Sequence, residues 1–192
     1  MRTFPAWAAA GPVHPVAVGM IMTPDMALDH ELRRWAPLDV SLLATRTPFT
    51  ALPVSVAQAE HVGDTIALQR GVHDLSAVGP AAYAYACTSG SFVRGVLGEQ
   101  LLVEAMRTAG APAALTTSGA LVRALTHLGV QRVGIATPYD PEVTQRLTSF
   151  LGECGIDVVA RAHLGLTGAI WTVPYGTTAG LVGRADHRDA QA

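Results

Sequence analysis

The sequence predicts an α/β protein with mostly parallel sheets, arranged in two halves. Short apolar runs alternate with longer amphipathic stretches along nearly the whole chain, which is the pattern of β-α units. The order of these elements in residues 1–112 resembles the order in residues 113–192. With 192 residues, 49 % hydrophobic and 15 % charged, the chain has enough apolar material for a substantial core. We therefore expect a globular protein with a first α/β half at 1–112 and a second at 113–192.

The first half contains three expected strands, at residues 16–22, 40–45 and 81–86. Three helical stretches alternate with them, at residues 26–35, 54–75 and 92–109. Gly63 and Gly71 weaken the second of these helices, because glycine lowers helix stability. Gly110, with Pro112 beyond it, ends the third helix in the usual way.

The second half begins at residues 113–115 and continues with expected strands at 132–136 and 156–160. A helix is expected at 119–128, and another opens with Asp140 as N-cap and Pro141 at its first position. That helix ends near Cys154. Beyond Arg161, glycines and prolines recur, and only residues 177–185 favour a helix. Because no strand pattern follows it, nothing is expected to return to the sheet, and the second half looks incomplete.

Composition excludes several classes of function. The net charge of −2 is spread without runs, so no footprint for nucleic acid or a membrane surface is present, and a small molecule is the expected partner. Residues 4–10 are too short and proline-flanked for a secretory core, and no run is long enough to span a membrane. Cys87 and Cys154 are read as reduced thiols, which favours the cytoplasm. The mean hydropathy of +0.30 favours an oligomer or an exposed apolar face.

Four loops follow expected strands and feed helix N-termini, where ligands bind in parallel sheets. They comprise residues 23–25, 87–91, 116–118 and 137–139. Hydroxyls and backbone N–H groups at helix N-termini suit a carboxylate, and none of these loops contains lysine or arginine. Thr23 and Pro24 lie in the first loop and are expected to help bind that carboxylate. No GxGxxG, P-loop, GxSxG or HExxH motif is present, and no cofactor or metal is expected.

Cys87 stands at the end of a strand and the start of a helix. A thiol placed there among backbone donors has its thiolate favoured, and it can act as nucleophile or proton carrier. The alternative is a small buried hydrophobe, because free cysteines are often fully buried. Cys154 lies in a turn away from the ligand edge and is read as structural.

Three further side chains in these loops have two interpretations each. Tyr139 either donates a phenolic hydrogen bond to substrate or packs its ring over the next helix. Thr117 and Ser118 either bind ligand or cap a helix, and these two roles are compatible. The histidines are spread singly, so none of them is assigned chemistry.

The chain resembles the maleate cis–trans isomerase and arylmalonate decarboxylase branch of the aspartate/glutamate racemase superfamily. The resemblance covers nearly the whole chain and is carried by residues 19–21, 87–95, 117–120, 128–130 and 137–139. It implies two Rossmann-like, flavodoxin-like halves related by pseudo-twofold symmetry, with the active site between them and no cofactor. It also implies that each half supplies one cysteine to the substrate α-carbon in racemases and isomerases.

Residue roles follow from the same resemblance. Cys87 corresponds to the first-half cysteine, and Tyr139 donates to the carboxylate or the developing enediolate. The residues implied to hold carboxylate oxygens are Thr88, Ser89, Thr117 and Ser118. The implied chemistry is a carbanion-like or thiol-adduct intermediate beside a carboxylate, stabilised by preorganised donors.

Two departures from the family pattern are visible. Residues 23–26 replace an asparagine-bearing loop of the maleate isomerases, and Asp25 would repel a dicarboxylate if it pointed inward. The strand that carries the second cysteine would follow Ala192, so we interpret the chain as a truncated or frame-altered relative unless a partner supplies those elements. Cys154 does not match the second position.

The leading hypothesis is a cofactor-independent isomerase or racemase acting on a small carboxylate through Cys87, like maleate cis–trans isomerase. An arylmalonate-type decarboxylase is the alternative, although the one-cysteine pattern of that enzyme places its cysteine in the other half. A catalytically inactive carboxylate-binding module and a fragment without activity are further alternatives.

Overall fold

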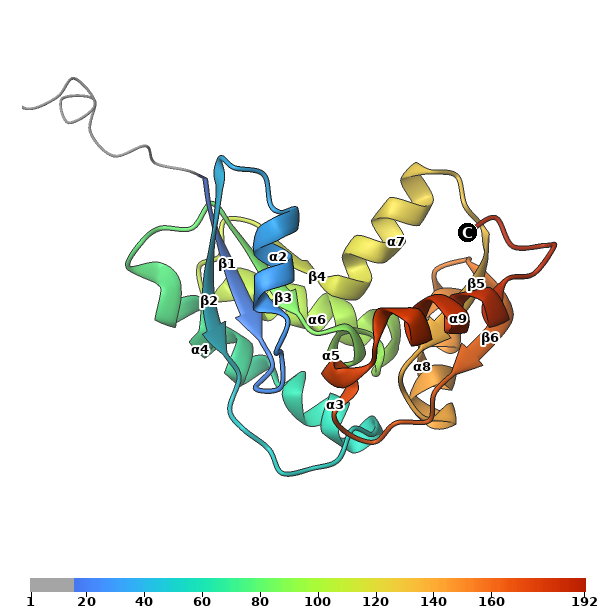
Figure 1. Ribbon diagram of the computed structural model, residues 1–192. Helices are drawn as coiled ribbons and strands as arrows, with labels where there is room; N and C mark the ends of the chain where they lie inside the picture. The colour runs from blue at the N-terminus through green and yellow to red at the C-terminus, as the bar shows by residue number, and fades with distance from the viewer. Residues whose placement is uncertain (1–15) are drawn as a thin grey trace, which may run out of the picture.

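The computed structural model describes residues 16–192, and the stretch at 4–10 discussed above lies outside the described residues. Figure 1 shows two groups of strands, each accompanied by helices. Within the described part of the chain, no helix combines the length and the hydropathy needed to cross a membrane. The alternation of strands and helices confirms the predicted α/β class.

A parallel four-stranded sheet forms the first group. Its strands are β1 (Val16–Met22), β2 (Val40–Arg46), β3 (Ala82–Ala86) and β4 (Ala114–Thr116), in the order β2-β1-β3-β4. The expected strands at 16–22, 40–45 and 81–86 are all present to within a residue. β4 pairs with β3 in this sheet, although the sequence pattern grouped residues 113–115 with the second half. The division into halves at residue 112 stays a prediction.

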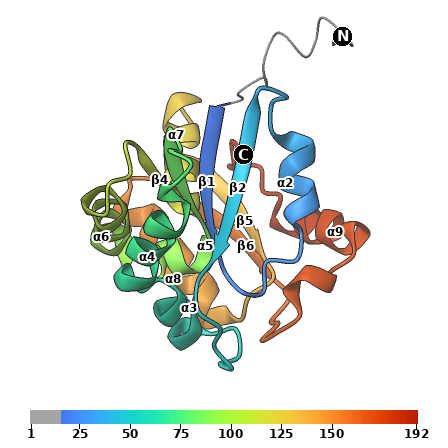
Figure 2. The same cartoon turned by 90° about the vertical axis from the view of Figure 1, so that its left-hand side faces the viewer.

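Five helices accompany the first sheet: α2 (Asp29–Trp35), α3 (Val56–Val62), α4 (Thr65–Ser76), α5 (Thr88–Phe92) and α6 (Gly95–Thr108). Helices α4 and α6 lie on one side of the sheet and α2 on the other (Figure 2). The helical stretch expected at 54–75 is divided at Gly63, and Asp64 caps α4 by accepting from the Ile66 N–H at 3.3 Å.

Helix α2 begins three residues later than the expected start at Met26. The Arg46 guanidinium explains the delay, since it donates to the carbonyls of Thr23 and Met26, each at 2.8 Å. It also binds the Asp29 carboxylate at 2.7 Å, at the first residue of α2. Residues 23–28 are therefore held as an ordered loop at the carboxyl end of β1.

The second group is a parallel pair, β5 (Arg132–Thr137) and β6 (Asp157–His163), with α7 (Thr117–His127), α8 (Pro141–Glu153), the 3₁₀ turn η1 (Ile170–Thr172) and α9 (Tyr175–Ala185). Asp140 caps α8 as predicted, accepting from the Val143 N–H at 2.8 Å. Gly129, at φ +68°, ends α7 in the left-handed conformation that glycine adopts without steric cost.

The expectation that nothing follows α9 back to the sheet is wrong. The Gln191 N–H donates to the Arg132 carbonyl at 2.8 Å, and the Gly134 N–H donates to the Ala192 carbonyl at 2.9 Å. The Gln191 side chain also accepts from the N–H of Arg132 at 3.0 Å. A segment of two residues is too short to show the alternation of apolar and polar side chains that identifies a strand, but Gln191 and Ala192 pair with β5 through these bonds.

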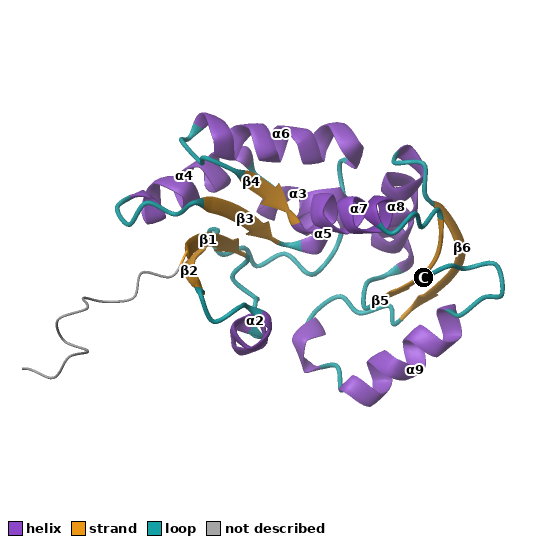
Figure 3. Ribbon diagram, turned by 90° about the horizontal axis from the view of Figure 1, so that it is seen from above, coloured by secondary structure: helices purple, strands orange, loops and turns teal. Residues whose placement is uncertain are grey.

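Two hydrophobic cores meet at the short helix α5. One core lies against the first sheet and contains Tyr85 and Cys87. The other contains Phe92 of α5 together with Val143 and Phe150 of α8. Figure 3, seen from above, shows α5 between β3 and α8. The Phe92 side chain is fully buried and therefore joins the Cys87 loop to the second group of strands.

We expect Phe92→Ala to lower the free energy of unfolding by about 3–5 kcal/mol, because it removes a fully buried ring from the core that joins the two groups of strands. Urea unfolding followed by circular dichroism measures the change. Phe49→Ala is the matched control, since the Phe49 side chain is 79 % exposed and its loss should cost less than about 0.5 kcal/mol. Equal losses for the two variants would contradict the packing described here.

Candidate carboxylate-binding site

The Cys87 turn connects β3 directly to α5. The helix expected at 92–109 is in fact two helices, and the first begins at Thr88 with Cys87 as its N-cap. The Cys87 Sγ accepts from the Gly90 N–H at 3.4 Å, as a capping side chain does. A Cβ on residue 90 would collide with the Tyr85 hydroxyl, so the turn requires glycine at that position.

Paired serines fix this turn against α7. The Ser91 and Ser118 hydroxyls lie 2.6 Å apart, and the Ser118 N–H donates to the Ser91 Oγ at 3.1 Å. Both hydroxyls also lie within hydrogen-bond distance of the Thr88 carbonyl, at 2.8 and 3.2 Å. Ser118 is buried and does not line the cavity described next, so the structure uses it to hold the turn.

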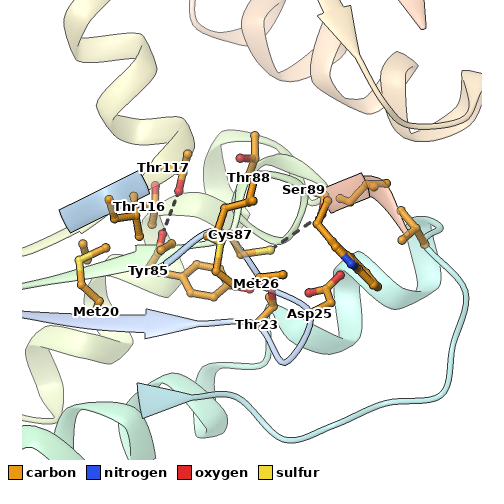
Figure 4. Close-up of a pocket in the computed structure, with 18 of the residues that line it drawn as sticks. Met20, Thr23, Asp25, Met26, Tyr85, Cys87, Thr88, Ser89, Thr116 and Thr117 are labelled. Atoms are coloured by element: carbon orange, nitrogen blue, oxygen red, sulfur yellow. Dashed lines mark hydrogen bonds between the residues drawn. The ribbon is translucent and has the colours of Figure 1, made fainter. Parts of the chain in front are cut away.

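A cavity of about 520 Å³ opens at the carboxyl ends of β1, β3 and β4, above the Cys87 turn. Figure 4 shows Cys87 at its centre, with Thr88 and Ser89 on one side and Thr23 and Asp25 on another. The predicted site residues that line it are Thr23, Cys87, Thr88, Ser89, Thr117 and Tyr139. The structure thus brings together residues from all four loops, which are more than 100 positions apart at their extremes. Pro24 lines an adjoining cavity of about 550 Å³ instead.

The position of Tyr139 is compatible with both roles considered for it, packing of its ring and hydrogen bonding to a ligand. Its ring packs edge-to-face on Phe92, with centroids 6.2 Å apart, and it is buried among the residues of the second core. It also lines the cavity. Burial raises the pKa of the Tyr139 phenol above its usual value, and the nearby Cys87 raises it further, while Ser89 and Thr88 oppose the shift. The hydroxyl is therefore protonated at neutral pH and remains a hydrogen-bond donor.

The pKa of Cys87 differs from the sequence-based expectation of a favoured thiolate. Burial raises the pKa of this thiol, and this effect exceeds the opposing effect of neighbouring donors, chiefly the Gly90 N–H. Negative charge on Asp25 raises it further. The expectation failed because α5 has only five residues and its donors act on a sulfur that is withdrawn from water. Cys87 is a neutral thiol at pH 7.

The two threonines at the start of α7, Thr116 and Thr117, make hydrogen bonds within the protein as well as lining the cavity. The Thr116 hydroxyl caps α7 by accepting from the Gly119 N–H at 2.9 Å, and it donates to Glu99 at 2.6 Å. The Thr117 hydroxyl donates to the Tyr85 carbonyl at 3.1 Å. The hydroxyls of Thr88 and Ser89 make no such bond to a carbonyl or carboxylate of the described residues, although the Ser89 hydroxyl lies 3.9 Å from the Cys87 Sγ.

Several lining residues were not singled out from the sequence. Tyr85 forms part of the wall and donates through its hydroxyl to the Val62 carbonyl at 2.7 Å. Its signal was the alternation in β3, which buries Tyr83 and Tyr85 on one face. Gln58 and Trp171 line both cavities and carried no local signal, because they reach the site only through tertiary packing. Over residues 16–192, no cluster of three or more His, Cys, Asp or Glu side chains has the geometry of a metal site.

A family model described as arylmalonate decarboxylase matches residues 37–192. Arylmalonate decarboxylase of Bordetella bronchiseptica is 32 % identical over 154 residues, which cover 79 % of this chain and 61 % of that protein. The chain thus spans about three fifths of the length of this curated relative.

Solved structures of arylmalonate decarboxylase and of maleate cis-trans isomerase are also similar to this chain. A double mutant of arylmalonate decarboxylase in a liganded form, with one glycine changed to cysteine and one cysteine to serine, superposes with a TM-score of 0.79 at 31 % identity, covering 89 % of this chain and 72 % of that chain. A Nocardia farcinica maleate cis-trans isomerase with a covalently bound succinylcysteine intermediate has a TM-score of 0.71 at 21 % identity, over 89 % of this chain and 73 % of that chain. This second likeness shows the fold alone.

The raised pKa of Cys87 predicts the pH dependence of its alkylation. Since only the thiolate reacts, the rate with iodoacetamide should keep rising above about pH 9, whereas a free cysteine levels off near its pKa of about 8.5. Mass spectrometry of the Cys87 peptide in a Cys154→Ser variant measures this rate without interference from the second thiol. A rate that levels off below about pH 8 would show that the donors around the sulfur outweigh its burial.

Proposed function

The chain belongs to the arylmalonate decarboxylase family. We propose that it acts on a small carboxylate without a cofactor, using the Cys87 thiol. One observation carries the proposal: Cys87, two hydroxyl-bearing residues of its turn and Tyr139 line a single cavity at the strand ends. A neutral thiol beside neutral donors suits a reaction in which negative charge develops on a carboxylate.

The proposed carboxylate lies against the Cys87 turn. Thr88 and Ser89 supply hydroxyl donors there, and Tyr139 supplies a phenolic donor that burial keeps protonated. Thr23 and Thr117 border the same space and are proposed to help bind the carboxylate directly. Ser118 is proposed to contribute by holding the Cys87 turn, and Pro24 from the adjoining cavity. Such donors stabilise an enediolate more than the ground-state carboxylate, because the enediolate carries more negative charge on its oxygens.

Cys87 is proposed to react at the carbon next to that carboxylate. In an isomerisation, the Cys87 thiol first gives its proton to water, and the thiolate adds to the C=C bond while the electron pair moves into the carboxylate. Rotation about the resulting single bond precedes expulsion of the thiolate, which restores the C=C bond and takes a proton back from water. In a racemisation, water removes the α-proton from one face, the Cys87 thiol gives its proton to the opposite face of the enediolate, and the resulting thiolate takes a proton back from water. Both reactions regenerate the cysteine and need no oxidant or reductant.

Decarboxylation is the second candidate. Loss of CO₂ from a malonate-type substrate would leave the same enediolate, and the Cys87 S–H would protonate its carbon. The similarity to arylmalonate decarboxylase at 32 % identity favours this reaction, and so does the raised pKa of Cys87, which keeps its proton available. A binding module without turnover is the third candidate, because the donors alone suffice to hold a carboxylate.

Two further properties are proposed from the same features. Both cysteines of the described chain are free thiols, in keeping with a cytoplasmic protein. Trp35 and Leu38 lie three positions apart in the chain and are strongly exposed, which supports a homo-oligomer.

We expect Cys87→Ala to abolish turnover of every substrate that the protein converts among maleate, an arylmalonate and α-amino acids, because the reacting group is removed. Proton NMR follows isomerisation and CO₂ loss directly, and exchange of the α-proton in D₂O reports racemisation. Cys154→Ala is the matched control and should keep turnover, since Cys154 lies outside the cavity. Unchanged turnover in Cys87→Ala would refute a catalytic role for this thiol.

Tyr139→Phe should lower kcat by about 10²–10³-fold, the loss seen when one donor to a developing oxyanion is removed. The ring that packs on Phe92 is retained, so the melting temperature should change little. Steady-state kinetics and thermal unfolding measure the two quantities. A variant with normal kcat would place the developing charge elsewhere in the cavity.

Thermal-shift measurements separate the binding module from the enzyme. If small carboxylates raise Tm of the wild-type protein but no member of the substrate panel is converted, the binding module is the correct reading. If the wild-type protein converts any of these substrates and Cys87→Ala does not, the binding module is excluded.

A further inference from the structure

The Asp25 carboxylate lies in the wall of the proposed site. It belongs to the loop after β1 and lines both adjoining cavities, together with Met26, Ala27, Val54, Gln58 and Trp171. Figure 4 shows Asp25 and Cys87 projecting from different loops toward the same space. The Asp25 side chain therefore points into the proposed site, the orientation in which it would repel a dicarboxylate.

We propose that Asp25 selects substrates by charge: the site takes a singly charged carboxylate whose second polar group donates a hydrogen bond or is positively charged, and it rejects dicarboxylates. This inference rests on the proposed function and narrows its substrate class to monocarboxylates. It thereby favours racemisation, or addition to the C=C bond of a monocarboxylate, over decarboxylation of a malonate. It sets this chain apart from a protein that works on two carboxylates, because the second one would meet Asp25.

The loop that carries Asp25 is held firmly from the other side. Arg46 binds the Thr23 and Met26 carbonyls, which flank Asp25, and the Asp29 carboxylate beyond them. The guanidinium charge is thus paired with Asp29 and does not neutralise Asp25. Asp25 itself forms no ion pair with any residue in the described part of the chain.

Within residues 16–192, no other formal charge lines the two cavities. Among the described lining residues, Asp25 is the single Asp, Glu, Lys, Arg or His; the remainder are neutral hydroxyl, amide, thiol or apolar side chains. The field of Asp25 reaches the reacting groups, since it raises the pKa of both Cys87 and Tyr139. An entering ligand therefore meets neutral donors at the Cys87 turn and one uncompensated negative charge at the loop after β1.

This arrangement treats two ligand groups differently. A carboxylate at Thr88 and Ser89 receives hydrogen bonds that offset its lost hydration. A second carboxylate placed toward Asp25 is repelled by a charge that nothing in the described lining screens, whereas an ammonium or hydroxyl group there gains a charge-assisted bond. Met20, Leu28 and Leu115 make the rest of the wall apolar, so an apolar body between these two groups is accommodated.

Labelling of Cys87 by charged thiol reagents tests the inference without any substrate. In a Cys154→Ser background, the rate with the cationic reagent 2-aminoethyl methanethiosulfonate is divided by the rate with the anionic 2-sulfonatoethyl reagent. Each reagent forms a disulfide with the thiolate and releases methanesulfinate. A change in the pKa of the thiol therefore alters both rates equally and leaves their ratio unchanged. We expect Asp25→Asn to lower this ratio at least about tenfold, because one unit charge beside the sulfur is removed.

The control removes the same charge elsewhere. Asp39 precedes β2 and is exposed at the amino end of the sheet, about 20 Å from the carboxyl ends of the strands by the rise of a seven-residue strand. Asp39→Asn should leave the labelling ratio within about twofold of its starting value. An Asp25→Asn ratio as unchanged as that of Asp39→Asn would overturn the inference.

Ligand binding supplies the second arm, with malonate as the dianionic probe and lactate as the singly charged probe that carries a hydroxyl donor. Thermal shift should show lactate favoured in the wild-type protein and malonate favoured by Asp25→Asn. Preference for malonate in the wild-type protein would overturn the inference. A labelling ratio that depends on Asp25, with neither probe bound by either protein, would support charge selection at this site and contradict the proposed function instead.

Discussion

The burial of α5 between two hydrophobic cores is the constraint on which the rest of the structure depends. At one end of this five-residue helix, Cys87 closes the core of the first sheet, and at the other end Phe92 enters the core built on α8. Because both ends are buried, the helix cannot shift without opening one core. The Ser91–Ser118 pair adds a polar link at 2.6 Å to α7, so three elements hold the turn that carries the thiol.

The same burial determines the chemistry available to the site. A cysteine at a helix start is expected to ionise easily, but the donors here are few and the sulfur is cut off from water. Burial also raises the pKa of Tyr139, whose ring packs on Phe92 and so helps to bury α5. A fold that fixes its reacting groups by packing thus also keeps them protonated. This favours reactions in which the cysteine gives a proton, or reacts only after a substrate carboxylate has been bound and oriented.

Sequence reasoning succeeded where a local signal decides the structure. The alternation of apolar runs located five strands, Asp140-Pro141 located the start of α8, and Gly129 located the end of α7. It failed where tertiary contacts compete with local preference. Arg46 delays α2 through carbonyls twenty and more residues away, and the Gln191 segment pairs with β5 over a distance in sequence that no periodicity reports. The loops of the site were foreseen because strand ends are recognisable, whereas Gln58 and Trp171 reach the cavity from elements with no such mark.

Charge distribution links these observations to function. Neutral donors surround the Cys87 turn, and Asp25 faces them across the cavity from a loop that Arg46 holds in place. If the site held its substrate by a basic side chain, a facing aspartate would simply be paired with that side chain and lose its influence. In the proposed binding mode the carboxylate is held by hydroxyls alone. The charge of Asp25 then stays uncompensated in the described lining, and the site can discriminate between ligands by their total charge. The proposed anion recognition by hydroxyls and the proposed charge selection by Asp25 therefore have one common cause, which is that the described lining of the cavity contains no cationic side chain.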